Sequence, residues 1–442
     1  ISPAHVAAIC ADATTCTLVP LDVQGNALSR ALLWMDVRAA AQADRITQTG
    51  HPALRYSLSG ASAEWMPAKA LWLQEHRLEI YQQTRWLVEY TDWLAYRLAG
   101  RLTLNRCTAT QKWHYDGRHG GWPHDFYAAI GLASAFDRIP EDVLPLGAPV
   151  GGLTREAADH TGLLAGTPVV AGGGDAPVGM LGLNVVRPGP MAVICGSSTV
   201  LLGFTEQAFH APGALGSFPD AVIPGLELIE AGQVSTGSVI SWFRREFAAD
   251  MKQLPARDAY RLLDEAAARV PPGADGLVAL ETFQGNRSPY ANALARGAIW
   301  GLSLQSTRAH IYRALLEGIA YGTKHILDTL SNHGYRPDEL VVAGGATRST
   351  LFMQIYTDVC GLPLRAVSDA EASLRGAAVA AAVGARAFPS FEAAAAQMAP
   401  TDRTFQPDEG THQKYRFWVE KYVQTYLRLK DLMREVGVAL DR

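Results

Sequence analysis

The chain has 442 residues, which is enough for two large domains or three small ones. Hydrophobic residues make up 48% and charged residues 19%, a composition that excludes extensive disorder and is typical of well-packed globular domains. A net charge of -4 leaves no basic surplus for nucleic acid, and no apolar run approaches the ~18 residues of a membrane-spanning helix. We therefore expect a small-molecule partner, without nucleic acid or membrane.

The cysteines bear on the cellular compartment, and the first residue bears on the start of the N-terminal domain. The five cysteines are scattered and show neither redox nor zinc-ligand spacing, which favours a cytoplasmic protein without structural zinc. The sequence begins with Ile1 rather than Met, and residues 6–21 already have the character of a strand in the middle of a domain. We expect that the first strands of the N-terminal domain are missing.

The N-terminal part of the sequence predicts strands followed by helices. The β-branched stretch 14–19 and the apolar run 31–35, separated by the turn Gly25-Asn26, predict two strands. Between residues 66 and 98, apolar residues recur at helical spacing, which predicts helices that cover a sheet.

Residues 169–182 are the most informative segment of the chain. A valine-rich strand ends in three glycines, Asp175 follows them, and further glycines open a close-packed helix. We place a domain boundary in the Pro/Gly-containing stretch after this helix, at 184–190. It divides the chain into an N-terminal domain of residues 1–184 and a C-terminal domain of residues 185–442.

The C-terminal domain is expected to combine strands with helices. Strands are predicted at 191–195 and 339–343. Ser349 is the expected N-cap of a helix that runs to Cys360 and is closed by Gly361. A small-residue helix at 372–385 and an amphipathic C-terminal helix with aromatic residues at spacings of three and four complete the domain.

Glycine-containing turns follow three predicted strands, at 172–174, 196–198 and 344–346. Each exposes backbone N–H groups where a side chain would block approach, which suits phosphate groups. One such turn is usually only a turn, but three at strand ends of an α/β pattern favour a nucleotide site. The chain contains no P-loop sequence, and 172–174 lacks the third glycine of a Rossmann motif, so the nucleotide would be bound in another way.

Asp175 is the candidate catalytic residue. A carboxylate at a strand end among glycines can take a proton from a hydroxyl group or orient a magnesium ion. The alternative is that Asp175 caps the following helix, which is a common role for aspartate. Its position alone leaves both interpretations open.

Several ordered motifs carry a family resemblance. Residues 341–354 (VVAGGATRSTLFMQ) resemble the adenosine-binding segment of the FGGY carbohydrate kinases, 285–289 (GNRSP) their second signature, and 33–39 (LWMDVRA) their sugar-domain motif. The similarity runs over essentially the whole chain in the family order, and the chain is identified as a member of this family. The resemblance implies an α/β kinase of the two-domain actin-like, ribonuclease-H-like ATPase fold, which binds the sugar mainly in the first domain and ATP in the second.

The resemblance also implies roles for individual residues. Asp175 matches the general base, close to the magnesium ion. Positions that match contacts to ATP are Gly196, Ser197, Gly237, Gly344, Gly345, Ala346 and Ser349. Family members begin with an Asp-Gly-Thr phosphate hairpin that does not precede residue 6 here. Either these strands are missing from the sequence, as the other intact motifs favour, or part of the catalytic apparatus is lost.

Local matches to ribulokinases suggest the sugar. Residues 107–113 (CTATQKW) and 230–233 (EAGQ) resemble ribulokinase segments in which Lys112 and Glu230 match sugar contacts, and Asp12-Ala13-Thr14 also resembles that branch. Each residue also has an alternative without a role in sugar binding. Lys112 would be a lysine in a loop, Glu230 an acid at a strand end in a salt bridge, and Asp12 the cap of a turn.

The resulting expectation is a pentulose kinase dependent on ATP and Mg²⁺. Asp12, Ala13, Lys112, Asp175 and Glu230 would surround the sugar, and ribulose would give ribulose 5-phosphate. Xylulose, another ketose or a polyol as substrate, and a catalytically inactive sugar- or nucleotide-binding protein, remain as alternatives. We expect a homodimer from the general frequency of dimers.

Overall fold

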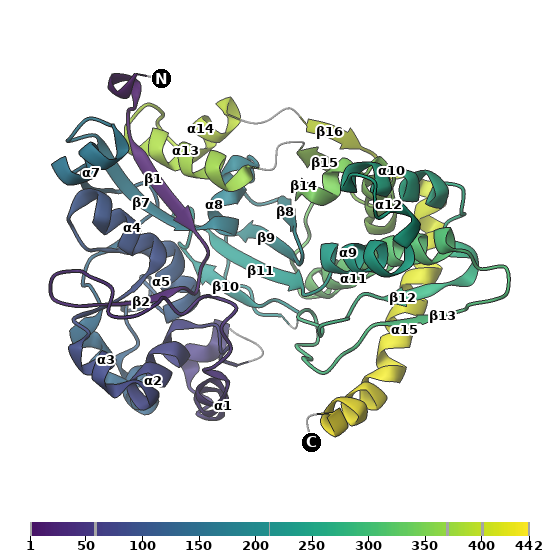
Figure 1. Cartoon of the computed structure of the whole chain (residues 1–442), viewed down its shortest axis with the longest axis horizontal. Coiled ribbons are helices and arrows are strands. Elements are labelled where there is room, and N and C mark those ends of the chain that lie inside the picture. The colour runs from purple at the N-terminus through teal and green to yellow at the C-terminus, as the bar shows by residue number, and fades with distance from the viewer. Residues whose placement is uncertain (1, 57–59, 212, 368–370, 399–401, 441–442) are drawn as a thin grey trace.

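The structure is a computed structural model that describes residues 2–440 apart from 57–59, 212, 368–370 and 399–401. Two α/β domains lie side by side (Figure 1), the N-terminal one mainly in purple and blue and the C-terminal one mainly in green and yellow. Among the described helices, none combines the length and the apolar character needed to span a bilayer.

The N-terminal domain is built on a three-stranded sheet in the order β1-β7-β6. β1 (Ile9–Ala13) runs parallel to β7 (Pro168–Gly174), which pairs antiparallel with β6 (Pro149–Gly152). Helix α4 (Tyr90–Ala99) packs against β1 and β7. The domain also contains β2 (Leu18–Leu21) paired with β3 (Trp86–Glu89), β4 (Leu104–Asn105) paired with β5 (Val143–Leu144), α1 (Ala40–Gln48), α2 (Met66–His76), α3 (Leu78–Gln83), α5 (Arg106–Trp113), α6 (His124–Ala129) and α7 (Arg155–Thr161).

The predictions for the first strands were wrong in their positions. Of the predicted strand at 14–19, residues 14–17 form the turn between β1 and β2, and only residues 18 and 19 belong to β2. In this turn the backbone N–H of Thr17 donates to Glu89 Oε2 at 2.9 Å. The apolar run 31–35 forms only an isolated bridge between Leu32 and Leu18, because its other large side chains point to solvent. The predicted helical stretch 66–98 contains α2, α3 and α4, but β3 interrupts it because this segment pairs with β2.

A seven-stranded sheet in the order β10-β11-β9-β8-β14-β15-β16 forms the centre of the C-terminal domain. β14 runs parallel to both β8 and β15, and the other neighbours are antiparallel. The strand bounds are β8 (Pro190–Cys195), β9 (Thr199–Thr205), β10 (Gly216–Pro219), β11 (Glu227–Gln233), β14 (Glu339–Gly344), β15 (Leu364–Val367) and β16 (Asp402–Phe405), with β12 (Val278–Leu280) and β13 (Ala298–Trp300) paired separately. The strands predicted at 191–195 and 339–343 are β8 and β14.

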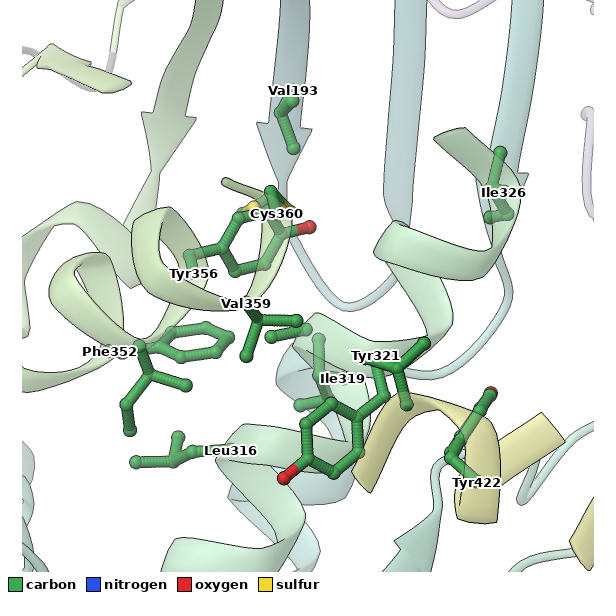
Figure 2. Packing of buried hydrophobic residues seen from close by; sticks show 14 of the residues in the cluster. Val193, Leu316, Ile319, Tyr321, Ile326, Phe352, Tyr356, Val359, Cys360 and Tyr422 are labelled. Carbon is green, nitrogen blue, oxygen red and sulfur yellow. The ribbon is translucent and has the colours of Figure 1, made fainter. Parts of the chain in front are cut away.

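Helices bury apolar side chains against this sheet. Figure 2 shows Tyr356 and Val359 of one helix gathered with Leu316 and Ile319 of another near Val193 of β8. Ser349 caps the first of these helices by accepting a hydrogen bond from Phe352 N at 3.0 Å, and Gly361 ends it, as predicted. The helices are α9 (Gly237–Phe247), α10 (Ala256–Ala267), α11 (Arg308–Asn332), α12 (Thr350–Cys360), α13 (Ala372–Gly384), α14 (Phe391–Gln397) and α15 (Glu409–Leu440).

Two small-residue helices join the domains. Helix α8 (Asp175–Gly182) follows β7, and α13 packs across it while also contacting β1 and β7 (Figure 1). A Cβ on Gly182 would lie 2.0 Å from the carbonyl oxygen of Ala372, and one on Gly376 would lie 1.9 Å from that of Val178. The glycines therefore let the two helices meet backbone to backbone along the second half of α8.

Candidate active site

Asp175 lies where β7 passes into α8. Glycine precedes it because the strand runs against its neighbour: a Cβ on Gly172 would lie 1.7 Å from the carbonyl oxygen of Ala11. The N-cap of α8 is Gly174, so the interpretation of Asp175 as the helix cap is wrong, and Asp175 is the first residue of the helix. Its Oδ1 accepts from the backbone N–H of Ala176 at 2.8 Å, and its carbonyl oxygen accepts from Ser373 Oγ at 3.0 Å.

Asp12 and Ala13 lie beside Asp175 on the neighbouring strand. In the β1–β7 pairing, Asp12 is opposite Gly173 and Ala13 is opposite Gly174. Asp12 is thus a strand residue, and the interpretation as a turn cap is wrong. Burial raises the pKa of Asp12, and the nearby carboxylate of Asp175 raises it further. The structure therefore brings two carboxylates together at one strand end.

Lys112 and Glu230 meet from different domains. Lys112 belongs to α5, not to a loop, and only 7% of it is exposed; Glu230 lies in the interior of β11, not at its end. The salt bridge considered for Glu230 is present, with 3.2 Å between Lys112 Nζ and Glu230 Oε2. Burial favours the neutral amine, but Glu230, Cys16 and Glu64 together outweigh the effect of burial and raise the pKa of Lys112.

The four charged groups act on one another. Burial raises the pKa of Asp175, the N–H of Ala176 and the ammonium of Lys112 lower it, and the carboxylate of Glu230 raises it. The same small region thus holds an ammonium donor and three carboxylate acceptors from both domains. Such a set can hold the hydroxyl groups of a polyol and leave one carboxylate to accept a proton.

The turn after β8 lies directly against the start of α9. The carbonyl oxygen of Ser197 accepts from the N–H groups of Thr236 at 3.0 Å and Ser238 at 3.1 Å. A Cβ on Gly237 would lie 2.3 Å from the carbonyl oxygen of Gly196. The structure therefore brings Gly196, Ser197 and Gly237 together, as a phosphate-binding turn requires.

The turn after β14 lies next to the turn after β8. Gly344 is paired with Cys195 in the parallel register and has a φ of 101°, and a Cβ on it would lie 2.2 Å from the Cys195 carbonyl oxygen. Gly345 and Ala346 follow in a short 3₁₀ helix, and the position of a Cβ on Gly345 is open space. Ser349 caps α12, and its hydroxyl lowers the pKa of Asp264, which burial raises. These four predicted adenosine residues form one continuous segment beside the predicted phosphate turn.

Further residues, which no sequence pattern indicated, support these groups. Ser373 of α13 binds the backbone of Asp175, and Asn105 caps α5 while Asp92 Oδ1 accepts from its backbone and side-chain amides, both at 2.8 Å. Arg118 binds across the domains to Asp220 and Glu227. None of these side chains stands in a motif with recognisable spacing, so the signal appears only in the fold.

Comparison with known proteins agrees with this geometry. Residues 1–182 match the N-terminal domain and residues 191–385 the C-terminal domain of the FGGY family of carbohydrate kinases. An FGGY carbohydrate kinase domain-containing protein of Xenopus laevis is 33% identical over 97% of this chain and 84% of its own length. A ribulokinase of Shouchella clausii is 34% identical over 96% of this chain and 80% of its own.

Solved structures share the fold. A xylulose kinase of Rhodospirillum rubrum superimposes with a TM-score of 0.84 at 25% identity, over 97% of this chain and 85% of that chain. A glycerol kinase of Plasmodium falciparum, solved with ADP, has a TM-score of 0.82 at 20% identity, over 94% of this chain and 83% of that chain.

The two domains and the site between them define a sugar phosphotransferase with the actin-like ATPase fold. The chain belongs to the FGGY family of carbohydrate kinases. The family resemblance seen in the sequence is thereby confirmed. ATP is the phosphoryl donor of FGGY kinases.

The residues fit the phosphates and a magnesium ion. A Cβ on Gly237 or Gly344 would collide with the neighbouring backbone, and a Cβ on Gly196 would meet its nearest atom only at 3.7 Å. Glycine at these positions leaves backbone N–H groups accessible, which suits phosphate groups. Mg²⁺ is usually bound by one or two carboxylates together with phosphate oxygens and water, which Asp12 and Asp175 can supply. Within the described part of the chain, no group of three or more His, Cys, Asp or Glu side chains forms a metal site of its own.

Proposed function

We propose that this protein transfers the γ-phosphoryl group of ATP to the terminal hydroxyl of a pentulose, with ribulose as the substrate and ribulose 5-phosphate as the product. The single observation that carries this proposal is the meeting of Lys112 and Glu230 beside Asp175. The ribulokinases at 32 to 34% identity over nearly the whole chain support it.

In this proposal Asp175 is the general base. Its carboxylate takes the proton from the sugar hydroxyl as that oxygen bonds to the γ-phosphorus and ADP leaves. Burial raises the pKa of Asp175, which strengthens it as a base, while the Lys112 ammonium and the Ala176 N–H keep the carboxylate ionised. Ser373 of α13 donates to the Asp175 carbonyl oxygen and holds this end of α8 in place, so orienting Asp175 costs little at the moment of reaction.

The remaining residues bind and orient. Lys112 donates to sugar oxygens and Glu230 accepts from sugar hydroxyls, and Asp12 and Ala13 form the wall from β1. The turns at 196–198 and 344–346 hold the phosphates and the adenosine of ATP with backbone donors. A magnesium ion held by Asp175 and Asp12 would neutralise charge on the transferring phosphates.

The test is ADP release by the full-length protein with ATP and Mg²⁺. The substrates are D-ribulose, L-ribulose, D-xylulose, L-xylulose and four- and five-carbon polyols. Turnover with either ribulose at the highest kcat/KM supports the proposal. Xylulose is included because the xylulose kinase of Rhodospirillum rubrum has a similar fold. Preference for a xylulose would support the kinase chemistry but overturn the choice of ribulose as the substrate. No ADP release with any of these substrates would indicate a catalytically inactive sugar- or nucleotide-binding protein.

A further inference from the structure

Arg118 connects the N-terminal domain to the turn between β10 and β11. Its Nε and Nη2 donate to the two carboxylate oxygens of Asp220 at 3.0 and 2.8 Å, and its Nη1 donates to Glu227 Oε1 at 2.9 Å. A further contact runs from Nη2 to the carbonyl oxygen of Leu226 at 3.3 Å. A bidentate guanidinium–carboxylate pair with additional acceptors fixes both position and orientation.

The acceptors on the C-terminal domain are themselves held in place. Glu227 is 3% exposed, and its other oxygen accepts from Ser217 Oγ at 2.8 Å. Asp220 also accepts from the backbone N–H of Gly225 at 2.6 Å, which closes the turn between the strands. The Arg118 guanidinium holds the pKa of Asp220 below its usual range. The carboxylates that Arg118 binds are therefore already fixed in position by other hydrogen bonds.

On its own side, Arg118 stands in a short closed loop that continues from α5. Asp116 and Gly121 exchange backbone hydrogen bonds of 2.9 and 2.8 Å across this loop, and Asp116 Oδ1 accepts from the backbone N–H of Arg118 at 3.0 Å. Arg55 binds the other oxygen of Asp116 at 2.8 Å. The loop is thus tied to the N-terminal domain at its base and to the C-terminal domain at its tip.

The same two segments are joined a second time at the sugar site. Lys112 lies six residues before Arg118 and binds Glu230, which lies three residues after Glu227 on β11. We propose that Arg118 is a positioning residue for sugar binding, which fixes residues 112–121 on the β10–β11 turn and so keeps Lys112 in register with Glu230. This inference rests on the proposed function, in which Lys112 and Glu230 hold the sugar.

The first test measures kcat and both KM values of the full-length enzyme with Arg118→Met. We expect KM for the pentulose to rise about tenfold, while kcat and KM for ATP stay within about twofold. A merely structural role would lower the melting temperature and the active fraction but leave both KM values unchanged, which would overturn the proposal. Arg101→Met is the matched control, because Arg101 forms an exposed pair with Asp142 at 2.8 Å within the N-terminal domain.

A double variant separates the loss of the Arg118 contacts from the effect of an unpaired buried charge. Arg118→Met leaves the buried Glu227 without its cation, whereas Arg118→Met with Glu227→Gln removes the charge as well. The double variant should fold as the native protein does and still show the tenfold rise in KM for the pentulose. If the double variant binds the sugar normally, the effect belongs to the stranded charge and the positioning role is wrong.

A double-mutant cycle with Lys112→Met tests the route of the effect. Because Arg118 acts through Lys112, adding Arg118→Met to Lys112→Met should change KM for the pentulose by less than twofold. A full tenfold change in both backgrounds would show that Arg118 acts independently of Lys112.

One readout does not depend on any sugar. Amide hydrogen exchange of residues 116–121 should accelerate at least about tenfold in Arg118→Met, with α7 (155–161) unchanged as the internal control. Unchanged exchange at 116–121 would overturn the anchoring role even if the protein phosphorylates no pentulose. Failure of the proposed function alone would appear as faster exchange together with an inactive native enzyme.

Discussion

Lys112 Nζ lies 3.2 Å from Glu230 Oε2, and this pair joins helix α5 of one domain to strand β11 of the other. The two side chains are 9% and 14% exposed, so water screens their attraction only weakly. Two of the five residues proposed to surround the sugar are therefore held together across the domain junction by a charge pair.

The first prediction concerns this pair. Lys112→Met leaves Glu230 without its cation in a largely dry place, and we expect a loss of about 2–3 kcal/mol in the free energy of unfolding. Lys112→Met with Glu230→Gln should regain most of that stability but not the affinity for the sugar. Urea unfolding and KM for the pentulose measure the two effects separately. A double variant as unstable as Lys112→Met would contradict the account.

The second prediction concerns Asp175. Asp175→Asn should reduce kcat by at least about a hundredfold, because the amide cannot accept the proton, while Kd for ATP by calorimetry stays within about twofold. The exposed Asp159 of α7 provides a matched control, and Asp159→Asn should leave both quantities unchanged. Turnover of Asp175→Asn close to that of the native enzyme would remove Asp175 as the base.

The third prediction concerns the dependence of the rate on pH. Only the ionised Asp175 accepts a proton, so kcat/KM should fall as the pH falls through the pKa of Asp175, which burial raises above the usual value of about 4. The Lys112 ammonium lowers the pKa of Asp175, so Lys112→Met should raise that pKa. The acid limb of the pH profile should shift to higher pH. A limb that stays in place or moves to lower pH would show that the ammonium does not act on Asp175.

The fourth prediction separates two glycines. In Gly237→Ala the added carbon would lie 2.3 Å from the Gly196 carbonyl oxygen, so the phosphate turn must shift, and we expect a lower melting temperature and a KM for ATP raised about tenfold. In Gly345→Ala the new methyl group enters open space in the protein. Its melting temperature should not change, whereas KM for ATP should rise if the adenosine lies there. Equal melting temperatures for the two variants would argue against the close contact of the two turns.

Local patterns allowed the strand ends of the site to be predicted. The strands before Asp175, Gly196 and Gly344 are short apolar runs followed by glycine, and this pattern depends only on neighbouring residues. Positions that depend on distant partners were harder to predict. Residues 86–89 form a strand because β2 lies beside them, although their own spacing favours a helix.

The charged residues show the same limit. Lys112 and Glu230 were recognised by family resemblance, whereas the alternatives placed Lys112 in a loop and Glu230 at a strand end. Only the fold reveals that the two side chains meet. Arg118 gave no signal, since a lone arginine in a glycine-containing loop is usually a solvated charge. Its partners lie 102 and 109 residues away in the sequence, which no local pattern can connect.

Phosphorylation of a pentulose at its terminal hydroxyl can be observed directly in the product. The most direct measurement is nuclear magnetic resonance of the product formed from ribulose by the full-length protein with ATP and Mg²⁺. We expect one phosphomonoester whose phosphorus couples to the protons on carbon 5, formed in a one-to-one ratio with ADP and at least about a hundredfold more slowly with Asp175→Asn. A phosphate on another carbon, or ADP formed without any sugar phosphate, would contradict it.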